Sequence, residues 1–372
     1  MVYVAGQGEV LRVGWVAGSE TLGRQSIFLA SWAAELARQG IQPCVFCPQN
    51  APTGVLEADW IHRYAQPHWL ARKADKTRGL AEAVLSAEVD VLHALDESAA
   101  SRTAAAADRL GRPYFLGCYR IGSRFHLPHK ARRLAGYLAA GDPIYQDMHK
   151  RRIVGEETVH LFRPGVWIAE EPKPLAFEER HAMILADVYN ASASDADAVL
   201  RCFLNIRNAG SGALFFLLHS DSQERSLRRR AETLGLLSDL TFVVQDAGGR
   251  AMHVIQSTDV FIAAGARKEF DWGALLAMAA GAPVLASRTD EGDFLHDGMT
   301  ASLFSPGDEE GLTALLTNLL TTPAWGRAQA RSALQYLHVY HNPFRCMSDL
   351  ANLYRAACAP AEEIAPKAEP QT

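Results

Sequence analysis

The sequence lacks the features that would indicate a membrane-spanning or nucleic-acid-binding protein. No apolar run reaches the ~18–20 residues that a transmembrane helix needs, although 48% of the 372 residues are hydrophobic. No long basic block occurs and the formal net charge is −5, so charge gives no reason to expect nucleic acid. Glu9 and Arg12 interrupt the apolar N-terminus, which argues against a signal peptide. We therefore expect a cytoplasmic location, with peripheral membrane contact left open.

Cysteines are also few, with six in the chain. Cys44 and Cys47 have the spacing of a redox or metal motif, but no second Cys/His pair follows at zinc-finger distance. They lie in a short predicted strand between Pro43 and Pro48, where alternation directs the two thiols to opposite faces. We interpret the pair as structural.

A metal site is equally unsupported by the sequence. No Asp-x-Asp follows a strand that would face a cleft. Asp195 and Asp197 stand at a predicted helix start, where capping of the helix N-terminus explains them. We therefore predict no bound metal and no cofactor.

Length and pattern indicate two α/β domains. A chain of 372 residues is long enough for two cores, and short apolar strands alternate with helical segments along it, as in parallel sheets. The proline-rich segment 170–174 divides the series. We predict an N-terminal Rossmann-like domain at 1–168, a C-terminal one at 175–335, and a disordered tail at 359–372.

The stretch 259–308 is the most informative. An apolar run at 260–263 precedes a charged turn with Arg267, Lys268 and Glu269, and a helical segment, a Gly-Ala-Pro stop and a second apolar strand follow. Together they form one βαβ unit of a parallel sheet. Ligands bind such sheets at the carboxyl ends of the strands, where a helix N-terminus offers free N–H groups. We therefore expect the charged turn to contact the ligand.

This stretch resembles the signature of GT-B glycosyltransferases of family 4, which transfer a sugar from a nucleotide-sugar donor with retention of configuration. The segments AMAAGAP at 277–283, DGMT at 297–300 and PGD at 306–308 match in order and spacing. The resemblance implies two Rossmann-like domains facing across a cleft, the first on the acceptor side and the second on the donor side. It also implies that the last helix, at 336–358, crosses back to the first domain. A nucleotide sugar and a glycan acceptor are the implied substrates.

The carboxylates of the family signature are changed in this chain. Its first glutamate falls on Lys268 and its second on Leu276. A shift by one residue makes Glu269 the first, but the second then becomes Ala277. The framework of the motif is present, and the pair of glutamates is not.

The family groups that hold the donor phosphates have also changed type. The arginine and lysine that neutralise the leaving diphosphate fall on Tyr189 and Ser194. The Gly-Gly loop before the first helix, expected here at 26–38, aligns with Gly23 and Arg24. An arginine at that position could grasp a phosphate from a distance. The histidine near the transferred sugar aligns with Tyr119.

These alignments give two sets of candidate residues, and no catalytic residue can be assigned. The candidates for donor and phosphate binding are Gly23, Arg24, Arg267, Lys268, Glu269 and Gly273. Other positions expected at the cleft are His93, Tyr119, Arg120, Tyr189, Ser194, His219 and Leu276. Phosphates are expected near Arg267, Lys268 and the N-terminus of the 272–280 helix, with Arg24 opposite.

Two functions of different class remain open. One is a divergent, metal-independent glycosyltransferase with a rebuilt donor site. The other is a catalytically silent GT-B protein that binds or scaffolds a partner, such as another glycosyltransferase, in glycan assembly. Loss of one electrostatic group typically costs about 2.7–4 kcal/mol of transition-state stabilisation, so activity depends on whether other cations replace the missing ones.

Overall fold

The computed structural model describes residues 10–51, 56, 58–65, 75–123, 133–151, 159–175, 177, 181–245, 250–265, 269–288 and 293–359. Beyond Ala359, the predicted tail at 359–372 lies outside these residues. Arg267 and Lys268 of the predicted phosphate site also lie outside them.

The N-terminal domain is built on a seven-stranded sheet with the strand order β3-β2-β1-β4-β5-β6-β7. Every paired strand in it is parallel. Its strands are β1 (Leu11–Val16), β2 (Ile41–Pro48), β3 (Ile61–Tyr64), β4 (Val91–Ala94), β5 (Tyr114–Cys118), β6 (Leu134–Ala139) and β7 (Val159–Leu161). Its helices are α1 (Ser19–Arg38), the short η1 (Ala58–Trp60), α2 (Asp75–Ser86), α3 (Glu97–Leu110) and α4 (Asp142–Lys150).

The C-terminal domain repeats this plan with six parallel strands in the order β10-β9-β8-β11-β12-β13. Its strands are β8 (Met183–Asp187), β9 (Leu214–His219), β10 (Leu240–Val244), β11 (Val260–Ala263), β12 (Val284–Ser287) and β13 (Ser302–Phe304). Its helices are α5 (Ala193–Asn208), α6 (Asp221–Thr233), α7 (Arg250–Ser257), α8 (Trp272–Ala279), α9 (Glu309–Thr321) and α10 (Pro323–Tyr340). In both sheets the order reverses beside the first strand, as in Rossmann folds, and ligands bind at that reversal.

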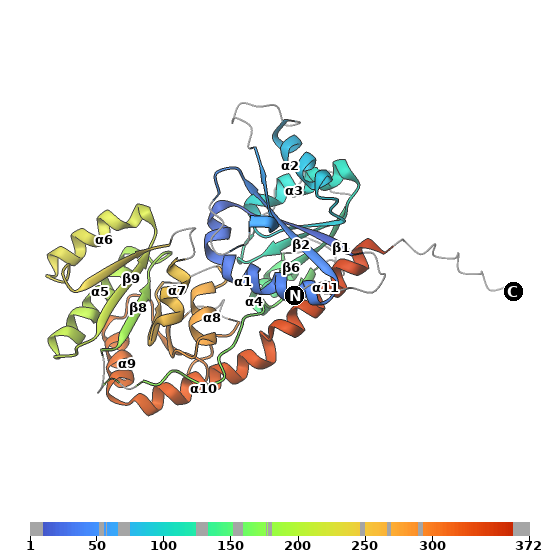
Figure 1. Ribbon diagram of the computed structural model, residues 1–372. Helices are drawn as coiled ribbons and strands as arrows, with labels where there is room; N and C mark the ends of the chain where they lie inside the picture. Colours follow the sequence, from blue (N-terminus) through green and yellow to red (C-terminus); the bar gives the residue numbers. More distant parts are fainter. Residues whose placement is uncertain are drawn as a thin grey trace.

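The chain ends with α11 (Pro343–Cys358), which returns to the N-terminal domain and packs against α1 and β4 (Figure 1). The predicted architecture of two Rossmann-like domains with a returning helix is confirmed. The single helix expected at 336–358 is instead interrupted at His341, because Asn342 caps a new helix and Pro343 cannot donate to the preceding turn. In the described part of the chain, no helix is both long enough and apolar enough to span a bilayer.

A continuous hydrophobic core joins the two domains. The ring of Trp272 on α8 lies 4.9 Å from that of Phe28 and 6.2 Å from that of Trp32, both on α1. Beside this contact, the Phe270 N–H donates to the Tyr119 carbonyl at 2.6 Å. The interface between the domains is therefore packed like a protein interior at this point.

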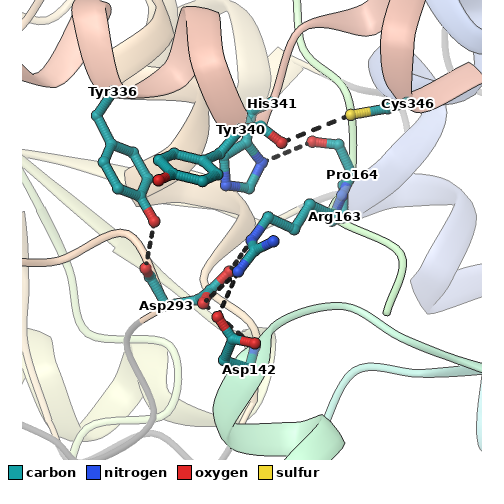
Figure 2. Close-up of polar contacts among 8 residues, drawn as sticks. All are labelled: Asp142, Arg163, Pro164, Asp293, Tyr336, Tyr340, His341 and Cys346. Carbon is teal, nitrogen blue, oxygen red and sulfur yellow. Dashed lines mark hydrogen bonds and ion pairs between the residues drawn. The ribbon is translucent and has the colours of Figure 1, made fainter. Parts of the chain in front are cut away.

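An ion cluster also links the domains, close to the point where the chain crosses between them (Figure 2). The Arg163 guanidinium, which follows β7, contacts Asp293 of the C-terminal domain through Nε at 2.7 Å and Nη2 at 3.4 Å. It also pairs with Asp142 at the start of α4. Asp293 further accepts from the Asp142 N–H at 3.2 Å, so a side chain of one domain caps a helix of the other.

Candidate functional site

A cavity of about 350 Å³ lies between the domains, at the carboxyl ends of β1, β4 and β5. This is the end of the sheet at which doubly wound folds bind ligands. Among the described lining residues, only three come from the C-terminal domain. The lining residues are Gly18, Ser19, Glu20, Thr21, Arg24, Gln25, Asp96, Glu97, Ser98, Gly117, Tyr119, Arg120, Glu269, Phe270 and Trp272.

The start of α1 differs from the sequence prediction and reshapes one wall of the cavity. The helix begins at Ser19 rather than at residue 26, so Gly23 and Arg24 lie on its second turn and not in a loop before it. Asp96, between β4 and α3, accepts hydrogen bonds from the Gly18 N–H at 3.2 Å and from the Thr21 hydroxyl. Gly18 has no side chain that could accept hydrogen bonds from the first turn of α1. The Asp96 carboxylate therefore supplies the acceptor at this helix start.

Arg24 reaches across the cleft to the C-terminal domain. Its guanidinium carbon lies 4.0 Å from the centre of the Tyr189 ring, which is a cation–π contact. The Tyr189 hydroxyl in turn donates to Glu20 at 2.8 Å. Burial, followed by this hydrogen bond, raises the pKa of Tyr189 to about 12, so the phenol stays neutral at physiological pH.

Glu269 forms ion pairs with two arginines that line the cavity. Its carboxylate lies 3.2 Å from Arg24 and 3.6 Å from Arg120, and it accepts from the Asn190 amide at 3.3 Å. An isolated antiparallel backbone bridge between Arg120 and Glu269 joins the two domains at this point. Four predicted candidates (Arg24, Tyr119, Arg120 and Glu269) therefore line one cavity, and Tyr189 contacts the first of them.

The N-terminus of α8 has an acidic environment. Asp271 caps the helix by accepting from the Ala274 N–H at 2.9 Å. A Cβ added at Gly273 would lie 3.3 Å from the Asp187 carboxylate and 2.9 Å from the Phe261 ring. Packing therefore explains the glycine. A second cavity of about 20 Å³ adjoins this helix end, lined by Arg24, Asp187, Asn190, Gln245, Met252, Glu269, Phe270, Trp272 and Gly273.

The other four predicted cleft residues lie outside the linings of both cavities. His93 is fully buried with Nδ1 2.7 Å from the Tyr354 hydroxyl, and burial lowers its pKa to about 3. His219 is also buried, with Nδ1 2.9 Å from the Ser220 carbonyl. Leu276 is a core residue of α8, and Ser194 lies on the first turn of α5.

Several residues of the cavity were not among the sequence candidates. Asp96 and Glu97 lie at the turn from β4 into α3, so their position near the carboxyl end of a predicted strand was a signal that could have identified them. Trp272 stands at the first position of α8, beside the predicted charged turn. Gln25 carries no comparable signal, because it lies inside a helix whose start is set by contacts from distant residues.

Acidic clusters suited to a metal are not found among the described residues, where no group of three or more His, Cys, Asp or Glu side chains could hold an ion. The predicted capping role is confirmed for Asp195 but not for Asp197, which pairs with Arg230. The Asp195 side chain accepts from the Ser192 N–H at 3.2 Å, while its own N–H donates to the Ser192 hydroxyl at 3.2 Å. This is a reciprocal capping box.

The chain is similar in sequence to one known protein family and in structure to several solved proteins. A family model described as glycosyl transferases group 1 matches residues 183–322. No curated protein sequence matches the chain.

Solved structures similar to this chain include a protein in complex with UDP, a sucrose-phosphate synthase and a glycosyltransferase. HepE from Anabaena, in complex with UDP, is 14% identical with a TM-score of 0.68, over 93% of this chain and 100% of that one. Sucrose-phosphate synthase from Thermosynechococcus elongatus is 16% identical with a TM-score of 0.68, over 93% and 98%. A glycosyltransferase from Rickettsia africae is 12% identical with a TM-score of 0.70, over 93% and 98%. The chain thus has the GT-B fold and is glycosyltransferase-like, and its C-terminal domain carries the match to the glycosyl transferases group 1 family.

Proposed function

We propose that this chain transfers a sugar from a nucleotide sugar to a glycan acceptor in the cleft between its domains. The proposal includes retention of configuration, as in family 4, and independence of metal. One observation carries it: the Arg24 guanidinium lies 4.0 Å above the Tyr189 ring. By the resemblance, Tyr189 stands where the family has its diphosphate arginine, so a cation from the opposite domain lies at that place.

A cation stabilises a diphosphate by its position, whichever domain supplies it. Burial of a diphosphate requires compensating charge, and arginine offers paired N–H donors to phosphate oxygens. Arg120 lies on the other side of Glu269 and adds a second guanidinium to the same cavity. Arg24 and Arg120 together therefore could replace the two missing cations of the family.

The Glu269 side chain would have to move away from Arg24 and Arg120 when the phosphates bind. Its side chain is 35% exposed, so it can rotate into solvent. Ion pairs with this much exposure are worth about 0–1 kcal/mol, whereas a diphosphate carries more charge than a carboxylate and can bind both guanidinium groups. The UDP bound in the structure of HepE makes UDP the first nucleotide to test.

The silent scaffold remains the second candidate, and a specific observation favours it. The cavity beside α8 is only about 20 Å³, whereas ligand pockets usually measure ~300–1,000 Å³. Asp271 caps that helix and Asp187 lies beside it, so an anion would meet carboxylates there. Under this hypothesis the cleft binds no nucleotide sugar, and the protein acts as a partner of another glycosyltransferase.

Calorimetric titration with UDP separates the two functions. The wild type should bind, and Arg24→Met should weaken binding by roughly 10–100-fold, since charged hydrogen bonds contribute about 1.5–3 kcal/mol. Arg78→Met is the matched control, because Arg78 lies on α2, does not line the cavity, and forms an ion pair with Glu82 that is exposed on both sides, at 66% and 62%. Equal affinities of wild type and Arg24→Met would remove Arg24 from the site. Absence of binding by the wild type would favour the scaffold. Transfer or hydrolysis of a UDP-sugar that a chelator abolishes would contradict independence of metal.

A further inference from the structure

We infer that two copies of this chain associate through an exposed aromatic patch at the break between α10 and α11. This crossover patch consists of Trp167, Val339, Tyr340 and Phe344. It lies where the chain passes between the domains, because the Val166 N–H donates to the His341 carbonyl at 3.0 Å. None of its four residues lines either cavity of the cleft, so the inference does not depend on the proposed function.

The crossover patch holds the aromatic side chains that this fold leaves exposed. Trp167, Tyr340 and Phe344 are 50%, 44% and 49% exposed, and the adjoining Val339 is 51% exposed. Every other aromatic side chain that the structure describes is buried or half-buried. The rings of Trp167 and Phe344 meet edge to face at 5.4 Å, so these two side chains form one surface. Concentrated apolar exposure of this kind marks interaction sites.

Packing within the chain does not account for these aromatic residues. The helix α10 buries a face of its own that includes Leu334 and Leu337, and α11 buries one that includes Met347 and Leu350. An amphipathic helix needs one such face to dock on its domain. The exposed aromatic side chains are therefore an addition to those faces, and a second surface has to cover them if they are to be buried.

The charges around the crossover patch occur in both signs. The exposed charged residues nearest to it along the chain are Arg331, Arg345, Glu170, Glu171 and Asp349. Arg345 lies at the edge of the patch, since its Nη1 donates to the Val339 carbonyl at 3.4 Å. An apolar centre with both signs around it is complementary to itself, because a cation of one copy can meet a carboxylate of the other. Two-fold symmetric dimers use one surface twice in this way.

A second copy fits the crossover patch better than a lipid surface does. Segments that recognise anionic lipids carry clusters of about 4–8 lysines or arginines, whereas carboxylates offset the arginines here. Tryptophan, tyrosine, phenylalanine and arginine are the residues enriched in protein interfaces. Trp167 and Phe344 at the centre are therefore expected to contribute most of the affinity, as buried aromatic anchors do.

Sedimentation velocity of the full chain tests the inference, at concentrations from ~1 to ~100 μM, since interfaces of ordinary size assemble at micromolar concentrations or below. The wild type should sediment with twice the monomer mass. Trp167→Ser and Phe344→Ser should each raise the dissociation constant by roughly 30-fold or more, because each change occurs twice in a symmetric interface. Arg345→Glu leaves the apolar centre intact and should raise it by roughly 10-fold through repulsion between like charges.

Leu85→Ser is the matched control. Leu85 is a 65% exposed apolar residue of α2, which lies at the top of Figure 1 while α10 lies at the bottom. This variant should dimerise like the wild type. A wild type that stays monomeric throughout, a dissociation constant unchanged in both Trp167→Ser and Phe344→Ser, or equal weakening by Leu85→Ser would each overturn the inference.

Vesicle sedimentation tests the other occupant of the crossover patch. The probe is a vesicle of phosphatidylcholine and phosphatidylglycerol, and the wild type should stay in the supernatant. Pelleting of the wild type that Trp167→Ser abolishes would overturn the inference and assign the patch to a membrane. Neither sedimentation experiment contains a nucleotide, so failure of the dimer and failure of sugar transfer are separate results.

Discussion

Replacement of Arg163 by methionine should destabilise the folded protein by about 3 kcal/mol, because it leaves a buried carboxylate without its cation. The Asp293 side chain is 5% exposed and that of Arg163 is 18% exposed. Methionine keeps most of the apolar stem of arginine, so the change isolates the charge.

The magnitude follows from the burial of each partner. Removal of one partner of a buried ion pair costs about 3–5 kcal/mol. The lower end applies here, because the Asp142 N–H still donates to Asp293 at 3.2 Å after the substitution. The Asp142 side chain is 55% exposed, so its own pair with Arg163 contributes only about 0–1 kcal/mol.

Urea unfolding followed by circular dichroism measures the effect. Arg288→Met is the control, because the pair of Arg288 with Asp297 is exposed on both sides, at 57% and 45%, and should cost below ~1 kcal/mol. Combination of Arg163→Met with Asp293→Asn should restore part of the stability, since no buried charge is then left alone.

Two results would refute this reasoning. One is a free energy of unfolding for Arg163→Met that equals that of Arg288→Met. The other is strict additivity of Arg163→Met and Asp293→Asn, which would mean that the two side chains do not depend on each other in the folded state.

Three further predictions concern packing and pH. Gly141→Ala should cost about 1–3 kcal/mol as an overpacked contact in urea unfolding, because the new Cβ would lie 2.8 Å from the Asp293 Cβ; unchanged stability would contradict the tight contact. Trp272→Ala should cost about 3–5 kcal/mol in the same assay, because Trp272 is 6% exposed and packs between the domains; a loss under ~1 kcal/mol would argue against a shared core. Burial lowers the pKa of His341 from 6.5 to about 4 and that of His93 from 6.5 to about 3. The unfolded chain therefore binds more protons than the folded one below pH ~6.5. The free energy of unfolding should have its full value above pH ~6.5 and should fall as the pH drops toward the pKa values of the folded state. A urea midpoint that stays level from pH ~7 to ~5 would contradict this prediction.

Local patterns were sufficient for the class of fold, because short apolar strands alternate with helical segments along the chain. The βαβ unit around α8 illustrates this: Gly281 has a φ of 80°, a conformation that glycine adopts without cost, and it stops the helix before β12. The linker at 170–174 separates the two sheets in the sequence and in the structure.

The site was less predictable, because its geometry depends on residues far apart in the sequence. The sequence around Gly23 reads as a polar loop, but Asp96 stabilises an earlier helix start from more than seventy positions away. That start turns Arg24 toward Tyr189, a contact across 165 positions that no periodicity could reveal. The pairing of Glu269 with Arg24 and Arg120 depends on the same placement.

The break between α10 and α11 brings the two chain crossings together at one point. The Val166 N–H donates to the His341 carbonyl at 3.0 Å, and the His341 ring contacts the Pro164 carbonyl at 2.8 Å, so the outgoing and returning segments are tied side by side. The Phe270 ring lines the cavity and lies 6.5 Å from the His341 ring. The paired crossings are therefore connected, through the rings of His341 and Phe270, to the wall of the cavity.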